Sequence, residues 1–95
     1  MAAETLYEDT TDGEGDVTEI TGDFELQIVD TGGGLMILQK ALGPGSSEED
    51  LRTVEEFKGP AHRYIVNPNT SRFRIVLSGS TRSGTRKATY QVPEA

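Results

Sequence analysis

Few residues of this chain have side chains suited to catalysis or metal binding. The chain has one histidine, His62, and no cysteine, so it lacks the His/Cys cluster of a structural zinc site. Asp12, Glu14 and Asp16 alternate as at the start of a calcium-binding loop. Val17, however, stands where such a loop has its turn glycine, and no glutamate occupies the twelfth position. We interpret these carboxylates as part of a solvated acidic segment and predict no metal site.

Nucleophilic and acid–base catalysis also lack a recognisable arrangement of residues. His62 has no aspartate near it in the sequence, and the serines lie in turn sequences, where their hydroxyls bond locally. None of the serines belongs to a nucleophile elbow. The adjacent carboxylates at 48–50 and 55–56 lie in polar stretches and are interpreted as solvated faces. We therefore predict that the chain is not an enzyme and carries no cofactor.

Charge is sorted along the chain. Residues 1–30 contain ten acidic side chains and no lysine or arginine, whereas residues 57–93 contain seven basic side chains and no acidic one. This separation favours an acidic segment that lies against basic residues, of either the same subunit or a neighbour. The net charge of −7 disfavours binding to nucleic acid, which requires a basic surface. We expect a protein-binding surface that includes four basic residues, Arg72, Arg74, Arg86 and Lys87.

The chain of 95 residues is long enough for one domain. Residues 1–22 are acidic, rich in threonine and glycine and poor in large apolar side chains, a composition typical of an extended segment. We predict that they form an arm that binds another chain through four apolar anchors, Leu6, Tyr7, Val17 and Ile20. Residues 23–95 would form the folded domain. We expect neither a signal peptide nor a membrane span, because residues 1–23 are polar and no apolar run approaches about 20 residues.

Alternating hydrophobicity from Asp23 onward predicts short strands at 24–28, 35–42, 53–57, 62–66, 72–77 and 86–92. The glycines at 32–34 permit positive φ angles and predict a hairpin between the first two strands. Ser46 and Glu49 fit a capping box, which predicts one helical turn over 47–52.

These segments together predict an all-β fold, a small antiparallel sandwich or barrel of about six strands preceded by the acidic arm. We expect the last strand to pair with the strand that carries Arg72 and Arg74. The residues expected to face the core are Phe24, Leu26, Ile28, Ile37, Val66, Phe73, Ile75, Leu77, Ala88 and Tyr90.

Four short motifs follow one another in the predicted domain: Leu38-Gln39 before a turn, Val54-Glu55 with Phe57, Arg72-Phe73-Arg74, and Ser83-Gly84-Thr85 before the last strand. In this order they resemble the small β-sandwich virion proteins of tailed bacteriophages. The resemblance covers about residues 23–93. The chain departs from that family where a D-G-G-x-T-W turn is expected, because residues 43–51 stand there instead.

The resemblance implies a structural protein, and we expect a capsid decoration (cement) protein that binds and stabilises the outer surface of the major capsid lattice. Such a protein would be made in the host cytoplasm and located on the capsid surface of the virion. Its partners would be the major capsid protein or another virion protein and further copies of itself, for example in a trimer, with no nucleic acid and no membrane. The alternatives are a tail or head-fibre adaptor and a non-catalytic carbohydrate- or protein-binding β-sandwich module.

Overall fold

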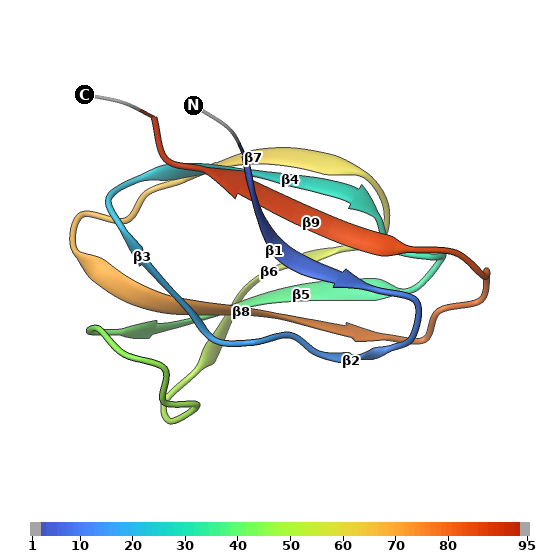
Figure 1. Cartoon of the computed structure of the whole chain (residues 1–95), viewed down its shortest axis with the longest axis horizontal. Helices are drawn as coiled ribbons and strands as arrows, with labels where there is room; N and C mark the ends of the chain where they lie inside the picture. The colour runs from blue at the N-terminus through green and yellow to red at the C-terminus, as the bar shows by residue number, and fades with distance from the viewer. Residues whose placement is uncertain (1–2, 94–95) are drawn as a thin grey trace.

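The protein consists of strands and connecting loops (Figure 1). The computed structural model describes residues 3–93, and no helix occurs among them. The strands are β1 (Glu4–Asp9), β2 (Gly13–Glu14), β3 (Thr18–Thr21), β4 (Phe24–Asp30), β5 (Leu35–Leu42), β6 (Arg52–Phe57), β7 (Ala61–Ile65), β8 (Thr70–Ser78) and β9 (Arg86–Gln91). Met1 and Ala2 of the predicted arm, and Glu94 and Ala95 of the predicted domain, lie outside the described residues.

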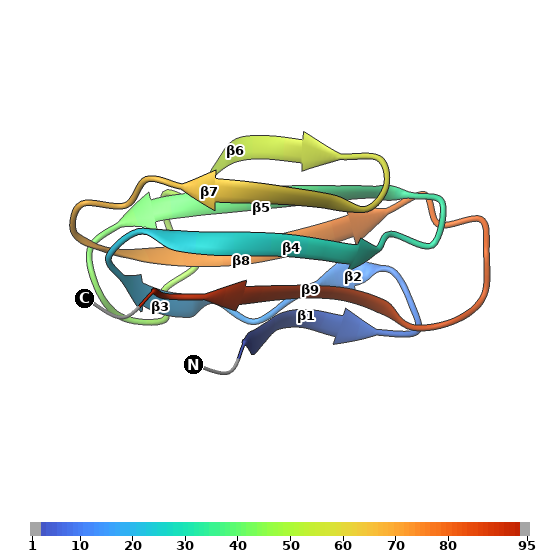
Figure 2. The same ribbon diagram turned by 90° about the horizontal axis from the view of Figure 1, so that it is seen from above.

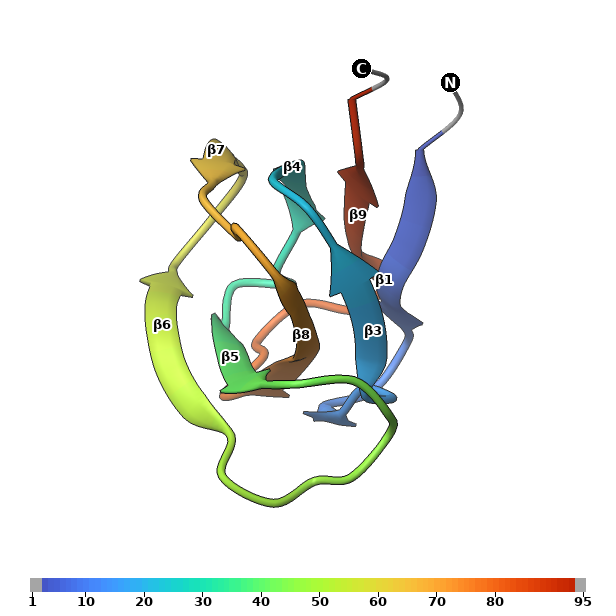
Figure 3. The same ribbon diagram turned by 90° about the vertical axis from the view of Figure 1, so that its left-hand side faces the viewer.

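The strands form two antiparallel sheets that pack face to face. The first sheet has the order β1-β9-β4-β7, and the second has the order β2-β8-β5-β6, with β3 also paired to β8. Seen end-on, the two sheets are two rows of strands with the core between them (Figure 3). Figure 2 shows that the strands of both sheets run along the long axis of the molecule. The prediction of an all-β, antiparallel fold is confirmed.

The core lies between the sheets, and in the longer strands it is built largely by alternate residues. In β4 and β8 the alternation is regular, because apolar side chains at every second position point inward. The rings of Phe24 and Phe73 meet edge to face across the core, with centroids 4.9 Å apart. Eight of the predicted core residues are buried as expected: Phe24, Leu26, Ile28, Phe73, Ile75, Leu77, Ala88 and Tyr90.

Two predicted core residues lie elsewhere. Val66 is 67% exposed, and the neighbouring Ile65 occupies the core position at the end of β7. Ile37 is half-buried, while Met36 and Leu38 on either side of it point into the core. The run from 35 to 38 is apolar at every position, so alternation there does not reveal which residues face inward.

The turn at residues 31–34 connects the two sheets, so the predicted hairpin is wrong. Gly32 and Gly33 have φ angles of 65° and 82°, the positive values expected of them. The amide of Gly34 donates to the carbonyl of Thr31 at 3.0 Å. However, β4 pairs with β7 and β9, whereas β5 pairs with β6 and β8. The glycines specify a tight reversal but not the strand that follows as a partner.

Two further local predictions are corrected. The last strand, β9, pairs with β1 and β4 and not with β8, so it lies in the opposite sheet from Arg72 and Arg74. Residues 47–52 form no helical turn, because the hydroxyl of Ser47 accepts the amide of Glu49 at 3.1 Å and Asp50 has a φ of 65°. Ser47 thus makes a local turn contact, which competes with a helix.

Residues 4–21 belong to both sheets, so the prediction of a separate extended arm is wrong for the described residues. β1 pairs with β9, and β2 and β3 pair with successive parts of β8. Leu6, Tyr7 and Ile20 are members of the core. The register of β1 shifts between Thr5 and Tyr7, and this bulge lets two consecutive side chains face inward. The acidic residues of the segment stay on its exposed side, which is why composition alone indicated an unpacked arm.

Candidate interaction surface

The eight residues predicted to bind a partner do not form one surface. Leu6, Tyr7 and Ile20 are buried between the sheets of their own subunit, and Val17 is half-buried. Arg72 and Arg74 lie on β8 in the second sheet, whereas Arg86 and Lys87 lie on β9 in the first. Arg72, Arg74 and Arg86 are buried, and Lys87 is half-buried.

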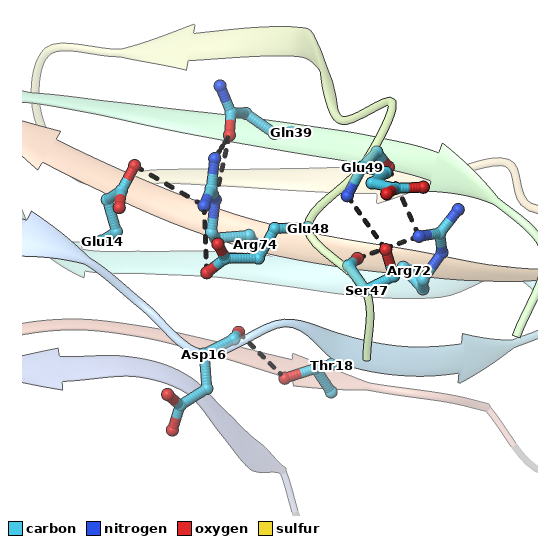
Figure 4. Close-up of polar contacts among 9 residues, drawn as sticks. All are labelled: Glu14, Asp16, Thr18, Gln39, Ser47, Glu48, Glu49, Arg72 and Arg74. Atoms are coloured by element: carbon cyan, nitrogen blue, oxygen red, sulfur yellow. Dashed lines mark hydrogen bonds and ion pairs between the residues drawn. The ribbon is translucent and has the colours of Figure 1, made fainter. Parts of the chain in front are cut away.

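Arg74 is held by side chains from three parts of the chain (Figure 4). Its Nη2 and Nε both donate to Oε1 of Gln39 on the neighbouring strand, at 2.6 and 3.1 Å. Its Nη1 lies 3.5 Å from a carboxylate oxygen of Glu14 and 3.7 Å from one of Glu48. Arg74 therefore joins β5, β2 and the loop after β5 on the outer face of the second sheet.

Arg72 holds the loop of residues 43–51, which we call the covering loop, against the outer face of the second sheet. Its Nη2 donates to the carbonyl of Leu42 at 2.8 Å, and its Nη1 donates to the carbonyls of Ser47 at 2.9 Å and Glu49 at 3.3 Å. Figure 3 shows the loop passing outside β5 and β8. The guanidinium is satisfied by carbonyl dipoles, and none of the described carboxylates makes an ion pair with it.

A pocket of about 460 Å³ opens where β5 ends and β6 begins. We call it the β5–β6 pocket. Its lining consists of Lys40, Ala41, Leu42, Asp50, Arg52 and Arg72. Leu42 is 76% exposed at this end of β5. Sequence reasoning missed Lys40 and Arg52, because both lie outside the basic half of the chain and no motif surrounds them.

The loops at the opposite end of the molecule are tied to one another. Arg86 donates to the carbonyls of Thr10 and Arg82. Asp12 accepts the amide of Ser80 at 3.1 Å, and the hydrogen bonds from the Ser80 side chain and backbone hold the pKa of Asp12 below its usual value. Arg82 also pairs with Asp30 at 3.1 Å. Arg86 therefore acts in folding, and its contacts are with its own subunit.

The outer face of the first sheet is polar and carries a small hollow of about 80 Å³. His62 lies there, on the surface as expected, with its Nε2 3.6 Å from a carboxylate oxygen of Glu25. Nearby on β7, the hydroxyl of the exposed Tyr64 donates to Asp23 at 2.9 Å. This hydrogen bond raises the pKa of Tyr64. The hollow is lined by Ala3, Glu25, Gln27, His62, Thr89, Tyr90 and Gln91.

A shallow pocket of about 330 Å³ lies between β1 and the β2–β3 segment and is partly acidic. Four carboxylates line it, Glu8, Asp9, Glu14 and Asp16. Within residues 3–93, however, no group of three histidine or carboxylate side chains is placed to hold a metal ion. The acidic residues at the start of the chain therefore line an edge of the molecule without converging on one point.

Comparison with known proteins adds no relative: no protein-family model, curated protein or solved structure matches the chain. Among the described residues there is also no helix with the length and apolar character needed to cross a membrane.

Proposed function

We propose that the chain is a virion structural protein, a capsid decoration protein that binds the outer surface of the major capsid lattice and stabilises it. The observation that carries this proposal is the strand order. β2 and β3 pair with successive parts of β8, so they can be counted as one interrupted strand. The orders β1-β9-β4-β7 and β2/β3-β8-β5-β6 are then those of a jelly-roll β-sandwich, an architecture used in viral capsid and lectin domains. The likeness of this strand order to capsid domains and the resemblance of the sequence motifs together support the proposal.

Self-association is part of the proposal. Within the described residues, β1, β7 and β6 each pair along one side only, which leaves open sheet edges. Open edges favour pairing with another chain. We propose a homo-oligomer, such as a trimer, in which edges of neighbouring subunits meet on the capsid. The charged residues along β1 and β6 would select the partner and set its orientation.

A second candidate function is a non-catalytic carbohydrate- or protein-binding module. It is favoured by the polar outer face of the first sheet, where amide, hydroxyl and imidazole groups surround the small hollow next to the exposed Tyr64. Such groups supply the hydrogen bonds and the apolar ring face by which sugars are bound. A tail or head-fibre adaptor would use the same fold, with a different virion partner.

The test is to locate the protein in purified particles of the phage whose genome encodes it. We expect the chain in many copies per particle by quantitative mass spectrometry, with immunogold label on the heads. Particles that lack the chain should release their DNA at a lower temperature, and adding the purified chain should restore the higher one. Label confined to tails would favour the adaptor. Its absence from particles, while it is present in the lysate, would overturn the proposal.

A further inference from the structure

The two open sides of the sandwich differ in charge. Figure 3 shows β6 and β7 along one side and β1 and β3 along the other. Residues 4–21, which include β1, β2 and β3, carry seven acidic side chains and no basic one. Residues 52–65, which include β6 and β7, carry three basic and two acidic side chains, with His62 in addition. One open side of the molecule is therefore strongly acidic, and the opposite side is not.

This acidity opposes a symmetric contact in which β1 of one copy pairs with β1 of another. β1 has Glu4 at one end and Glu8 and Asp9 at the other, and all three residues are exposed. An antiparallel pair of β1 strands in matched register would place acidic residues opposite acidic residues at both ends. Like charges that face each other across two strands are destabilising. The β1 edge therefore favours a partner strand that has no acidic residue.

β7 is such a strand on the opposite side of the molecule. It contains His62 and Arg63 and no acidic residue. It pairs with β4 over five residues without a register shift, whereas the pairing of β6 with β5 is interrupted by one. Irregular edges pair less readily with a further strand. Of the two edges on this side, β7 is therefore the better template for pairing.

Arg63 places positive charge along the β7 edge. Its Nε lies 2.6 Å from a carboxylate oxygen of Glu55 on β6, and its Nη1 donates to the carbonyl of His62 at 3.0 Å. Its Nη2 donates no hydrogen bond to the described residues, and the side chain is 48% exposed. A carboxylate of a neighbouring subunit can therefore bind this guanidinium without displacing Glu55.

The strand directions also suit a contact between unlike edges. Each neighbouring pair in the order β1-β9-β4-β7 is antiparallel, so the two edge strands β1 and β7 run in opposite directions. A second copy related by a rotation about an axis along the strands keeps its strand directions. Its β1 would then lie antiparallel to β7 of the first copy and continue the first sheet. Contacts of this head-to-tail kind close into a ring or extend as a filament.

We propose that copies of this chain associate head to tail, with β1 of one subunit paired antiparallel to β7 of the next. Arg63 binds a carboxylate of the neighbouring β1, and β6 lies near the neighbour's β2–β3 segment. The acidic side of one copy thus meets the less acidic side of another. This contact rests on the self-association in the proposed function and names its two edges. It requires no capsid, so the purified chain is sufficient to test it.

Cross-linking of two single-cysteine variants tests the contact, because the chain has no cysteine of its own. Thr5→Cys is exposed on β1, and His62→Cys is exposed on β7. The first variant is ¹⁵N-labelled, mixed with the unlabelled second variant, and treated with a bismaleimide that spans roughly two strand spacings, about 10 Å. Mass spectrometry then counts the labelled chains in each cross-linked pair. We expect at least about tenfold more mixed pairs than pairs of like chains.

Random collision would give mixed and like pairs in equal amounts, and this result would overturn the proposal. An excess of like pairs would also overturn it and would show that identical edges meet. Ser46→Cys, which is exposed in the covering loop on neither edge, replaces His62→Cys as the control. The control mixture should show no excess of mixed pairs.

A charge variant tests the role of Arg63 in the same contact. Arg63→Gln should weaken association by roughly two- to fivefold in sedimentation velocity at low ionic strength. Arg82→Gln is the matched control, because it also removes an exposed arginine that pairs with one carboxylate, Asp30, and it should associate like the unmodified chain. Unaltered association of the folded Arg63 variant, or an unmodified chain that stays monomeric at millimolar concentration, contradicts the proposal. The location of the chain in phage particles is decided separately, by the immunogold labelling.

Discussion

Nη1 of Arg74 lies 3.5 Å from Oε2 of Glu14, so a residue of the basic half of the chain faces a residue of the acidic N-terminal segment within one subunit. The side chain of Arg74 is only 11% exposed, and it is also bonded to Gln39. Asp30 likewise pairs with Arg82, and Asp12 accepts a hydrogen bond from the amide of Ser80. Part of the sorted charge therefore serves to join the first and last thirds of the fold.

Deleting residues 2–20 should abolish the folded state. The deletion removes β1, β2 and most of β3, which form edges of both sheets, together with the buried Leu6, Tyr7 and Ile20. Circular dichroism and thermal unfolding of the truncated chain provide the measurement. A truncated protein that unfolds cooperatively near the original temperature would contradict the assignment of this segment to the core.

Ile75→Ala should lower the free energy of unfolding by about 2–5 kcal/mol, because it leaves a cavity between the sheets. Ile75 is 0% exposed in the middle of β8. Val66→Ala is the control, since Val66 lies outside the core and its loss should change stability by less than about 0.5 kcal/mol. Urea unfolding of the two variants gives both values. A larger loss of unfolding free energy for the Val66 variant than for the Ile75 variant would show that Val66, and not Ile75, faces the core.

Arg72→Met should release the covering loop while leaving most of the sheets intact. The substitution removes the donors to the carbonyls of Leu42, Ser47 and Glu49, and each lost contact is worth about 0.5–1.5 kcal/mol. A glutamate-specific protease should then cut at Glu48 or Glu49 at least about tenfold faster. Arg52→Met serves as the control, because its exposed side chain makes no hydrogen bond to the described part of this loop. Unchanged cleavage of the Arg72 variant would rule out this role.

Stability should fall as the pH drops below about 4, with Asp23 as one contributor. The amide of Asn67 and the hydroxyl of Tyr64 donate to its carboxylate, and they hold its pKa below the ordinary value of 3.8. The unfolded chain therefore binds the proton first, so the stabilisation is present above pH 3.8 and is lost as the pH falls through the folded-state pKa.

Asp23→Asn should flatten this acid dependence in urea unfolding measured between about pH 6 and 2.5. The matched control is Glu56→Gln, which removes a carboxylate that accepts no hydrogen bond from the described residues. The control should keep the acid dependence. A variant at position 23 with an unaltered pH profile would show that its hydrogen bonds do not stabilise the ionised carboxylate.

Local patterns in the sequence predicted the strands from β4 to β9 within one or two residues at most boundaries. Alternation in β4 and β8 is regular enough to identify their inward residues, including Phe24 and Phe73. The turn at Gly32 and Gly33 was equally predictable from the sequence, because glycine readily adopts positive φ angles. The candidate site was not predictable to this extent. Lys40, Arg52 and Arg72 are 12 to 32 positions apart, and they line one pocket because β5 pairs with both β6 and β8.

By itself, the sequence determined the secondary-structure class, most strand positions and the separation of charge, since these depend on neighbouring residues. The tertiary structure decided which strands pair, and it placed Glu4 opposite Tyr90 and Thr18 opposite Phe73. Such pairing depends on apolar contacts between segments that are far apart in the sequence. In β1 the acidic residues around the two core residues make the strand look like a solvated segment. The same tertiary contacts buried Arg72 and Arg74 under a loop and left Leu42 and Arg52 open. Which side chains remain free to contact a partner is therefore decided by the fold, because folding determines which charges are already neutralised within the chain.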